Sequence, residues 1–324
     1  MQTILCPLTR YKSRVLPIIL VCAFTACSTG TSSPGQTPTE VNHPAVVSVN
    51  APPNAAPVPA PSGAANVTDY GAIGDGQTDS TRAFQAAMST GGHVWVPRGT
   101  YLLKQLTPVS GMTLECEDWG AILKVADNLN GGLIAKYYTE APVSNVTIMN
   151  CQIDGNKAHN TQGSAIQFSG THILVYNNYI HDTAYAAVNL GRPSGADDMA
   201  IVDNHCENPA LPGNFWGCYA FTGGTNLVMS GNTATSSDHA MAYAYDVEPN
   251  PGWTVSNVTI RDNTAIGGFL QVKGGNGGIT RDVHILNNSI DATGAAGWKW
   301  VLTAIYVQGV EGIVEIAGNQ AIPQ

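Results

Sequence analysis

Seven short segments of the chain repeat one alternating pattern of apolar and polar positions. Each begins with an apolar residue, has a second apolar residue two positions later, and reaches a corner residue five positions after its start, as in ILVYNNYI from Ile173. The segments start at Val146, Ile173, Met199, Leu227, Val258, Val283 and Val314. Successive starts are about 25–31 residues apart, which is within the period range of solenoid repeats. Alternation with a period of two predicts strands with one buried face, not helices.

The corner position is asparagine in six of the seven segments and Cys151 in the first. The six are Asn178, Asn204, Asn232, Asn263, Asn288 and Asn319. Asparagine tolerates left-handed backbone geometry, and its amide bonds neighbouring backbone. Stacked at one rung spacing, such amides also bond one another. The pattern therefore predicts an asparagine ladder inside a repeated turn.

A second set of apolar pairs lies between the first strands. These pairs are Ile166/Phe168, Val188/Leu190, Tyr219/Phe221, Tyr245/Val247, Leu270/Val272 and Ile305/Val307. Two or more strands per repeat, with no long amphipathic helix between them, predict an all-β fold, a parallel β-helix.

Charge excludes one class of partner. The net charge of the chain is −9, and from Asn66 onward 11 Lys and Arg stand against 22 Asp and Glu. Because phosphate contacts require a basic face, the sequence argues against nucleic-acid binding. An acidic body also disfavours a polyanion unless a cation or a local basic patch assists.

The first 65 residues are expected to serve targeting. Residues 1–27 combine a basic start with an apolar run too short to span a bilayer, and end in FTAC at Cys27. This resembles a bacterial lipobox, which implies lipidation of Cys27 and, with Ser28 next, an outer membrane lipoprotein in the periplasm or at the cell surface. Residues 28–65 are rich in Ser, Thr, Pro and Ala and are expected to be a disordered spacer. The folded domain is predicted over residues 66–324.

Four further cysteines remain in that domain, which in an oxidising compartment permits two disulfides. Cys206 with Cys218 is the preferred pair, because twelve residues separate them. Cys116 with Cys151 is a second pairing, because these cysteines fall in successive coils.

The start of the domain resembles a known superfamily. The matching residues are Asp69-Tyr70-Gly71-Ala72, Gly74-Asp75-Gly76, Thr78-Asp79, the segment around Ala83-Phe84-Gln85-Ala86-Ala87, and Val96-Pro97-Arg98-Gly99-Thr100-Tyr101. They resemble the pectate-lyase superfamily of polysaccharide-active proteins. The resemblance implies a right-handed parallel β-helix whose open end is covered by a short N-terminal capping helix. Asp75 and Asp79 are expected to shape the turn and the cap, not to catalyse.

Alternation along the second strand set places two rows of side chains on the outer face. One row is Gln167, Asn189, Ala220, Asp246, Gln271 and Tyr306, and the other is Ser169, Gly191, Thr222, Glu248, Lys273 and Gln308. Asp246 and Glu248 form a carboxylate pair, and Lys273 is expected one coil below Glu248. Candidate substrate-binding residues are Gln167, Asn189, Gln271, Tyr243 and Tyr306.

This carboxylate pair admits several chemistries. Two carboxyls divide acid and base roles in glycoside cleavage, or hold Ca²⁺ and bridge it to a uronate. The alternative is a structural Glu248 that pairs with Lys273. A lyase needs a base and a cation, for which Lys273, Arg192 and His239 are candidates.

The resemblance makes a β-eliminating uronate lyase the first expectation. The motifs of the superfamily's hydrolases and epimerases are absent, and so is an Arg-Pro pair in the strand context expected for pectate lyases, since Arg192-Pro193 falls in a loop. A glycoside hydrolase using the carboxylate pair is the second, and a non-catalytic polysaccharide-binding surface lipoprotein the third. Further expectations are a polysaccharide partner, Ca²⁺ as the one candidate cofactor, membrane contact only through the lipid, and an oligomer as an open alternative.

Overall fold

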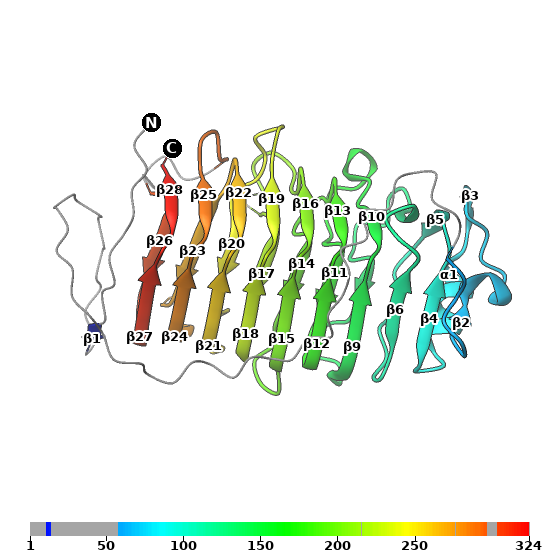
Figure 1. Ribbon diagram of the computed structural model, residues 1–324, viewed down its shortest axis with the longest axis horizontal. Coiled ribbons are helices and arrows are strands. Elements are labelled where there is room, and N and C mark those ends of the chain that lie inside the picture. The colour runs from blue at the N-terminus through cyan, green and yellow to red at the C-terminus, as the bar shows by residue number, and fades with distance from the viewer. Residues whose placement is uncertain (1–10, 14–57, 215, 276, 297–302, 324) are drawn as a thin grey trace.

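The computed structural model describes residues 11–13, 58–214, 216–275, 277–296 and 303–323. They form an elongated parallel β-helix in which strands of successive coils lie side by side along the long axis (Figure 1). Each full coil passes through three sheets, A, B and C, before the next coil begins. The predicted fold is therefore confirmed.

Sheet A begins each coil. In spatial order its strands are β1 (Tyr11–Ser13), β27 (Val310–Ala317), β24 (Ile279–Leu286), β21 (Thr254–Arg261), β18 (Gly224–Ser230), β15 (Asp197–Val202), β12 (Gly170–Tyr176), β9 (Val143–Met149), β6 (Thr113–Cys116), β4 (His93–Val96) and β2 (Ala65–Asn66). All the pairings are parallel except that of β1 with β27. Strand β1 falls within the predicted signal peptide, most of which, including Cys27, lies outside the described residues.

Sheet B follows the asparagine corner. Its strands are β28 (Gln320–Ile322), β25 (Ser289–Asp291), β22 (Thr264–Ile266), β19 (Thr233–Thr235), β16 (His205–Glu207), β13 (Tyr179–His181), β10 (Gln152–Asp154), β7 (Ala121–Val125), β5 (Gly99–Leu103) and β3 (Asp75–Asp79).

Sheet C completes the coil. Its strands are β26 (Ile305–Gln308), β23 (Phe269–Lys273), β20 (Tyr243–Val247), β17 (Tyr219–Phe221), β14 (Val188–Leu190), β11 (Ile166–Phe168) and β8 (Ile134–Ala135). Inward side chains of the three sheets fill one continuous apolar core.

The predicted asparagine ladder runs along the corner between sheets A and B. Asn178 Nδ2 donates to Asn204 Oδ1 (3.0 Å), and the same bond repeats from coil to coil as far as Asn319. The left-handed residue is not the ladder asparagine but the one before it, such as Asn177 (φ 48°) or Asp203 (φ 53°). The preceding residue therefore makes the turn, while the asparagine satisfies buried backbone groups.

The N-terminal end is covered as the sequence predicted. Helix α1 (Thr81–Met88) buries Ala83, Phe84, Ala87 and Met88 against the first coils, and lies between the short helix η1 (Val67–Tyr70) and β4. Asp79 Oδ1 accepts from the backbone N of Thr81 (3.0 Å), and Asp75 Oδ1 accepts from the backbone N of Thr78 (2.7 Å). Both carboxylates thus shape the turn and the cap. A second short helix, η2 (Lys157–His159), lies in the turn after β10.

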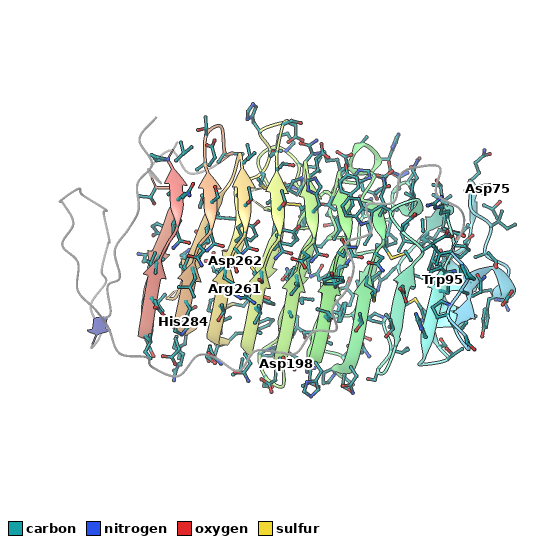
Figure 2. All side chains as sticks on the ribbon, viewed as in Figure 1. Asp75, Trp95, Asp198, Arg261, Asp262 and His284 are labelled. Carbon is teal, nitrogen blue, oxygen red and sulfur yellow. A yellow bond between two sulfur atoms is a disulfide. The ribbon has the colours of Figure 1, made fainter. Side chains whose placement is uncertain are left out.

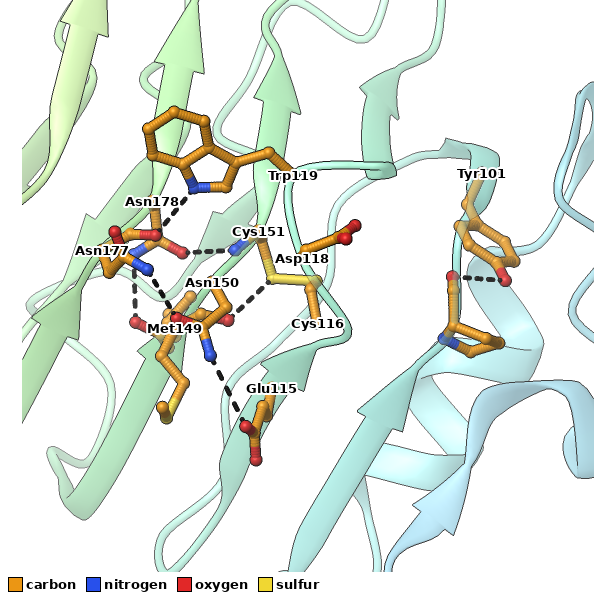
Figure 3. Close-up of a disulfide and its surroundings, with 12 residues drawn as sticks. Tyr101, Glu115, Cys116, Asp118, Trp119, Met149, Asn150, Cys151, Asn177 and Asn178 are labelled. Atoms are coloured by element: carbon orange, nitrogen blue, oxygen red, sulfur yellow. Dashed lines mark hydrogen bonds between the residues drawn. A yellow bond between two sulfur atoms is a disulfide. The ribbon is translucent and has the colours of Figure 1, made fainter. Parts of the chain in front are cut away.

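Both disulfides predicted from the sequence are present. Cys206 is bonded to Cys218 and Cys116 to Cys151, and Figure 3 shows the second of these at the start of the asparagine ladder. Cys151 occupies the ladder position of its coil, and its backbone N donates to Asn178 Oδ1 (3.0 Å). The disulfide therefore takes the place of one more asparagine rung. Among the described residues, no helix is long and apolar enough to cross a membrane.

Candidate active site

The outer face of sheet C has the register that the sequence predicted. Gln167 pairs with Asn189, Asn189 with Ala220, and Ala220 with Asp246. The row continues through Gln271 to Tyr306. Inward neighbours such as Tyr245 and Val272 are completely buried. The alternation of these two side-chain sets is what holds the outward row in line.

Asp246 and Glu248 share one hydrogen-bond donor. Gln271, on the next strand, donates from Nε2 to Asp246 Oδ1 (3.1 Å) and to Glu248 Oε2 (2.9 Å). Lys273 Nζ donates to Glu248 Oε1 (2.7 Å), so the predicted ion pair is confirmed. The two acids therefore belong to one network with a defined orientation.

The two carboxyl groups differ sharply in their surroundings. Asp246 is only 9% exposed, whereas the side chain of Glu248 is 34% exposed. Burial, assisted by the negative charge of Glu248, raises the pKa of Asp246 to about 7, and the hydrogen bond from Gln271 and the charge of Lys273 only partly oppose this. Asp246 can therefore hold a proton near neutral pH while it lies beside a second carboxylate.

A small hollow of about 10 Å³, which is room for about one water molecule, lies beside Asp246. It is lined by Ala186, Trp216, Gly217, Tyr219, Ala220, Tyr243 and Asp246. Trp216 comes from the loop before β17 and stacks on Tyr185 with ring centroids 5.5 Å apart. Tyr243 packs edge-on against Phe269 at 4.8 Å. Aromatic rings thus border the acid on the side where the chain enters sheet C, and such rings suit the apolar faces of sugars.

A second aromatic pair borders the opposite edge of sheet C, where the chain leaves it. Tyr138 lies in the loop after β8 and Trp253 in the loop after β20, and their ring centroids are 5.0 Å apart. Arg192 Nη2 donates to the backbone O of Tyr138 at 3.5 Å. Its Nε is buried and has no hydrogen-bond partner among the described residues. Arg192 therefore lies among the loops that border sheet C, not within the acid pair.

The remaining predicted site residues are dispersed. His239 lies in an exposed turn between β19 and β20, where its Nδ1 is 3.1 Å from the backbone O of Gly294. Asn189 Oδ1 accepts from Thr222 Oγ1 (3.4 Å), and Tyr306 donates to Gln308 on its own strand. Gln167 is exposed at the far end of the row. Asp246, Glu248, Gln271 and Lys273 form one hydrogen-bonded group.

Sequence reasoning missed Trp216, Tyr138 and Trp253. Each lies in a loop that directly precedes or follows a strand of sheet C, and that position is a usable signal. The loops that carry them differ in length from coil to coil, which is why the repeat pattern did not mark them.

Comparison with known proteins identifies the family. Residues 64–315 match the family model described as rhamnogalacturonase A/epimerase, pectate lyase-like. The chain belongs to this family. That agrees with the resemblance carried by Asp69-Tyr70-Gly71-Ala72 and the segments after it.

Individual relatives match smaller parts. The pre-neck appendage protein of Bacillus phage phi29 is 31% identical over 102 residues, which covers 30% of this chain and 12% of that protein. The corresponding protein of Bacillus phage PZA is 30% identical over the same length. The chain thus spans about an eighth of these curated relatives.

Solved structures show the same fold. A hyperthermoactive exopolygalacturonase from Thermotoga maritima has a TM-score of 0.56 and 15% identity, with 69% of this chain and 66% of that chain covered. An iota-carrageenase in complex with iota-carrageenan fragments has a TM-score of 0.51 and 15% identity, with 69% and 54% covered. At such identities the likeness concerns the β-helix alone.

Proposed function

We propose that this protein cleaves a polysaccharide by hydrolysis at the outer face of sheet C, with Asp246 as general acid and Glu248 as its partner. The observation that carries this proposal is the unequal carboxyl pair. One member is buried with its pKa raised to about 7, and the other is oriented by Lys273. Glycoside hydrolysis requires two carboxyl groups whose surroundings separate their roles.

The proposed reaction uses each group in a defined way. Asp246 donates its proton to the glycosidic oxygen as the bond to the sugar breaks. Glu248, oriented by Gln271 and Lys273, acts as the second carboxyl group, on a water or on the sugar carbon itself. Gln271 fixes both carboxyls, because a single amide nitrogen lies within 3.1 Å of one and 2.9 Å of the other. Trp216 and Tyr243 border Asp246 and are the rings that we propose contact the sugar.

Family membership supports a carbohydrate-active protein. The family is described by a rhamnogalacturonase and an epimerase, and the structural neighbours named above are an exopolygalacturonase and a carrageenase. These descriptions apply to those proteins. For this chain they make a polysaccharide the first class of substrate to test.

β-Elimination is the second candidate, and it was the first expectation from the sequence. It needs a base beside a uronate and a cation that stabilises the developing charge. Lys273 adjoins the acids, and Arg192 has an unpaired buried nitrogen nearby among the loops that border sheet C. Hydrolysis is preferred because Lys273, the cation beside the acids, is already bonded to Glu248.

Ca²⁺ does not fit the acid pair as the structure has it. Ca²⁺ takes six to eight oxygen ligands, whereas the amide nitrogen of Gln271 and the ammonium of Lys273 already occupy the facing carboxylate oxygens. No group of three or more His, Cys, Asp or Glu in the described parts of the chain is arranged to hold a metal. We therefore assign no step to Ca²⁺, and metal dependence is left to experiment.

The test is a polysaccharide digestion with two parallel readouts. The full chain is incubated with pectate, alginate, rhamnogalacturonan and neutral glycans, with Ca²⁺ or with a chelator. Hydrolysis is expected to release reducing ends without ultraviolet absorbance from unsaturated uronates. Asp246→Asn and Glu248→Gln should each lower the rate by roughly 100-fold or more. Asp262→Asn is the control, because Asp262 is exposed in the corner directly after β21, beside Arg261 (Figure 2).

Other outcomes have defined meanings. Absorbance together with reducing ends would replace hydrolysis with β-elimination. Retention of a polysaccharide without any cleavage would leave the non-catalytic binding protein, which the ion pair of Glu248 with Lys273 also permits.

Lipid anchoring through Cys27 is a separate proposal. It rests on the FTAC sequence and the spacer after it. Metabolic labelling with palmitate should mark the wild-type chain and not Cys27→Ser. Equal labelling of the two would contradict the anchor and with it an outer-membrane location.

A further inference from the structure

The outer face of sheet B carries a cluster of aromatic rings, here called the aromatic face. It consists of Trp119, Tyr179, His181 and His205. The ring of Tyr179 lies 5.4 Å from that of Trp119, 5.2 Å from that of His205 and 4.9 Å from that of His181. All four residues are half-buried.

Two structural features turn these rings outward. Ile180 and Cys206 are completely buried, so alternation directs the residues on either side of them away from the core. Strands β13 and β16 are in register, which sets Tyr179 directly beside His205. Trp119 reaches the same place from the corner after β6, where its Nε1 donates to the backbone O of Asn177 (2.9 Å; Figure 3).

Hydrogen-bonding groups surround the rings. Tyr179 Oη donates to Glu207 Oε2 (2.6 Å). The ring nitrogens of His181 face Asp182 Oδ2 (2.9 Å) and Gln152 Nε2 (3.0 Å). Glu207 retains a second oxygen that can accept from a ligand, whereas the second oxygen of Asp182, Oδ1, lies 3.9 Å from Lys157 Nζ. Burial lowers the pKa of His205, so its ring is uncharged at neutral pH.

The fold does not require aromatic residues at these positions. In the next three coils, the position in register with Tyr179 and His205 is Thr233, Thr264 and Ser289. Those coils make the same rungs with small polar side chains. The aromatic residues are therefore an addition to the solenoid, confined to one stretch of sheet B.

We propose that the aromatic face is a second carbohydrate-binding site, which holds neutral sugar units of a glycan chain at a distance from Asp246 and Glu248. Aromatic rings pack against the apolar faces of sugars, and carboxylates accept hydrogen bonds from their hydroxyls. The carboxylates of Glu207 and Asp182, on a protein of net charge −9, disfavour an anionic chain at this face.

Two sites on different sheets give such a protein an advantage. A glycan held at the aromatic face has a higher local concentration of its sugar units near sheet C, because two linked binding sites raise the effective concentration of a shared ligand. The proposal stands on sheet B alone. Its failure would leave the chemistry at Asp246 untouched, and the reverse is also true.

The experiment measures binding of the full chain to xylan, galactan, mannan, cellulose and dextran, with pectate as an acidic comparison. Affinity electrophoresis gives the dissociation constants. Asp246→Asn serves as the background, so that cleavage does not remove the ligand. Trp119→Ala and Tyr179→Ala should each weaken binding of a neutral glycan by roughly tenfold. Tyr70→Ala, an exposed tyrosine at the N-terminal end, should change nothing.

Trp119→Phe distinguishes ligand stacking from a structural role. It keeps a ring but removes the hydrogen bond to Asn177, so binding should largely survive even if the thermal midpoint falls. The proposal is wrong if no neutral glycan is retained, or if Trp119→Ala binds as well as the background protein. It is also wrong if wild-type chains associate in sedimentation and Trp119→Ala separates them, because the face is then a protein interface.

Discussion

Replacing Asp246 with asparagine should abolish the proposed acid and at the same time stabilise the protein at alkaline pH. The pKa of Asp246 is raised from 3.8 to about 7, first by burial and then by the charge of Glu248. Between these two values the folded protein holds a proton that the unfolded chain has released. The free energy of unfolding therefore falls as the pH rises, and the loss is complete once the pH exceeds the folded pKa.

The size of this effect follows from the shift. A pKa difference of about 3 units, at 1.36 kcal/mol for each unit, corresponds to about 4 kcal/mol. Because the side chain is only 9% exposed, solvent does little to screen it. Asparagine has a similar shape and no charge, so it escapes this cost.

The difference in free energy of unfolding between wild type and Asp246→Asn is measured by urea unfolding, followed by tryptophan fluorescence. The measurement is made at several values from about pH 5 to about pH 9. The urea midpoint of the wild type should fall relative to that of Asp246→Asn from about pH 5 to just above about pH 7, and the two should run parallel at higher pH. Asp262→Asn removes an exposed carboxylate and should follow the wild type. Parallel curves for wild type and Asp246→Asn over the whole range would refute the assignment of a raised pKa to this group and weaken its role as acid.

Three other perturbations test separate parts of the molecule. Trp216→Ala should raise the KM for polysaccharide by roughly tenfold with a smaller change in kcat, and steady-state kinetics showing an effect on kcat alone would contradict its contact with sugar. Asn232→Ala should lower stability by about 2–4 kcal/mol, because it leaves buried backbone and amide groups of two neighbouring coils unpaired; an unchanged urea midpoint would argue against the ladder. Replacing Cys206 and Cys218 together with serine should lower the free energy of unfolding by about 3 kcal/mol, as expected for a loop of this length. Calorimetry measures this change, with the reduced wild type as comparison.

The site was partly accessible from the sequence because the repeat itself sets the register. Once the second strands are aligned at their apolar pairs, such as Tyr245/Val247 with Leu270/Val272, the position of Asp246 relative to Gln271 follows, and so does that of Glu248 relative to Lys273. Both relations are found in the structure. Rung spacing and strand alternation are local consequences of a backbone that repeats, so a one-dimensional pattern contains them.

The surroundings of those residues were not accessible in the same way. Trp216 and Tyr138 belong to loops that follow no repeat, and their places beside sheet C depend on contacts between distant coils. The strand pattern marks Asp246 only as outward-facing, whereas in the structure this side chain is buried, which raises its pKa.

The sequence by itself determined the solenoid, its asparagine corner, its N-terminal cap and the order of side chains along sheet C, because each depends on residues one or two coils apart. Tertiary structure alone decided which outward acid is buried and which aromatic rings border it. It also decided that Trp119 joins Tyr179 and His205, although sixty residues separate Trp119 from Tyr179. These outcomes depend on how loops fold across several coils, and solvent exposure, with the pKa it sets, is a property of that packing.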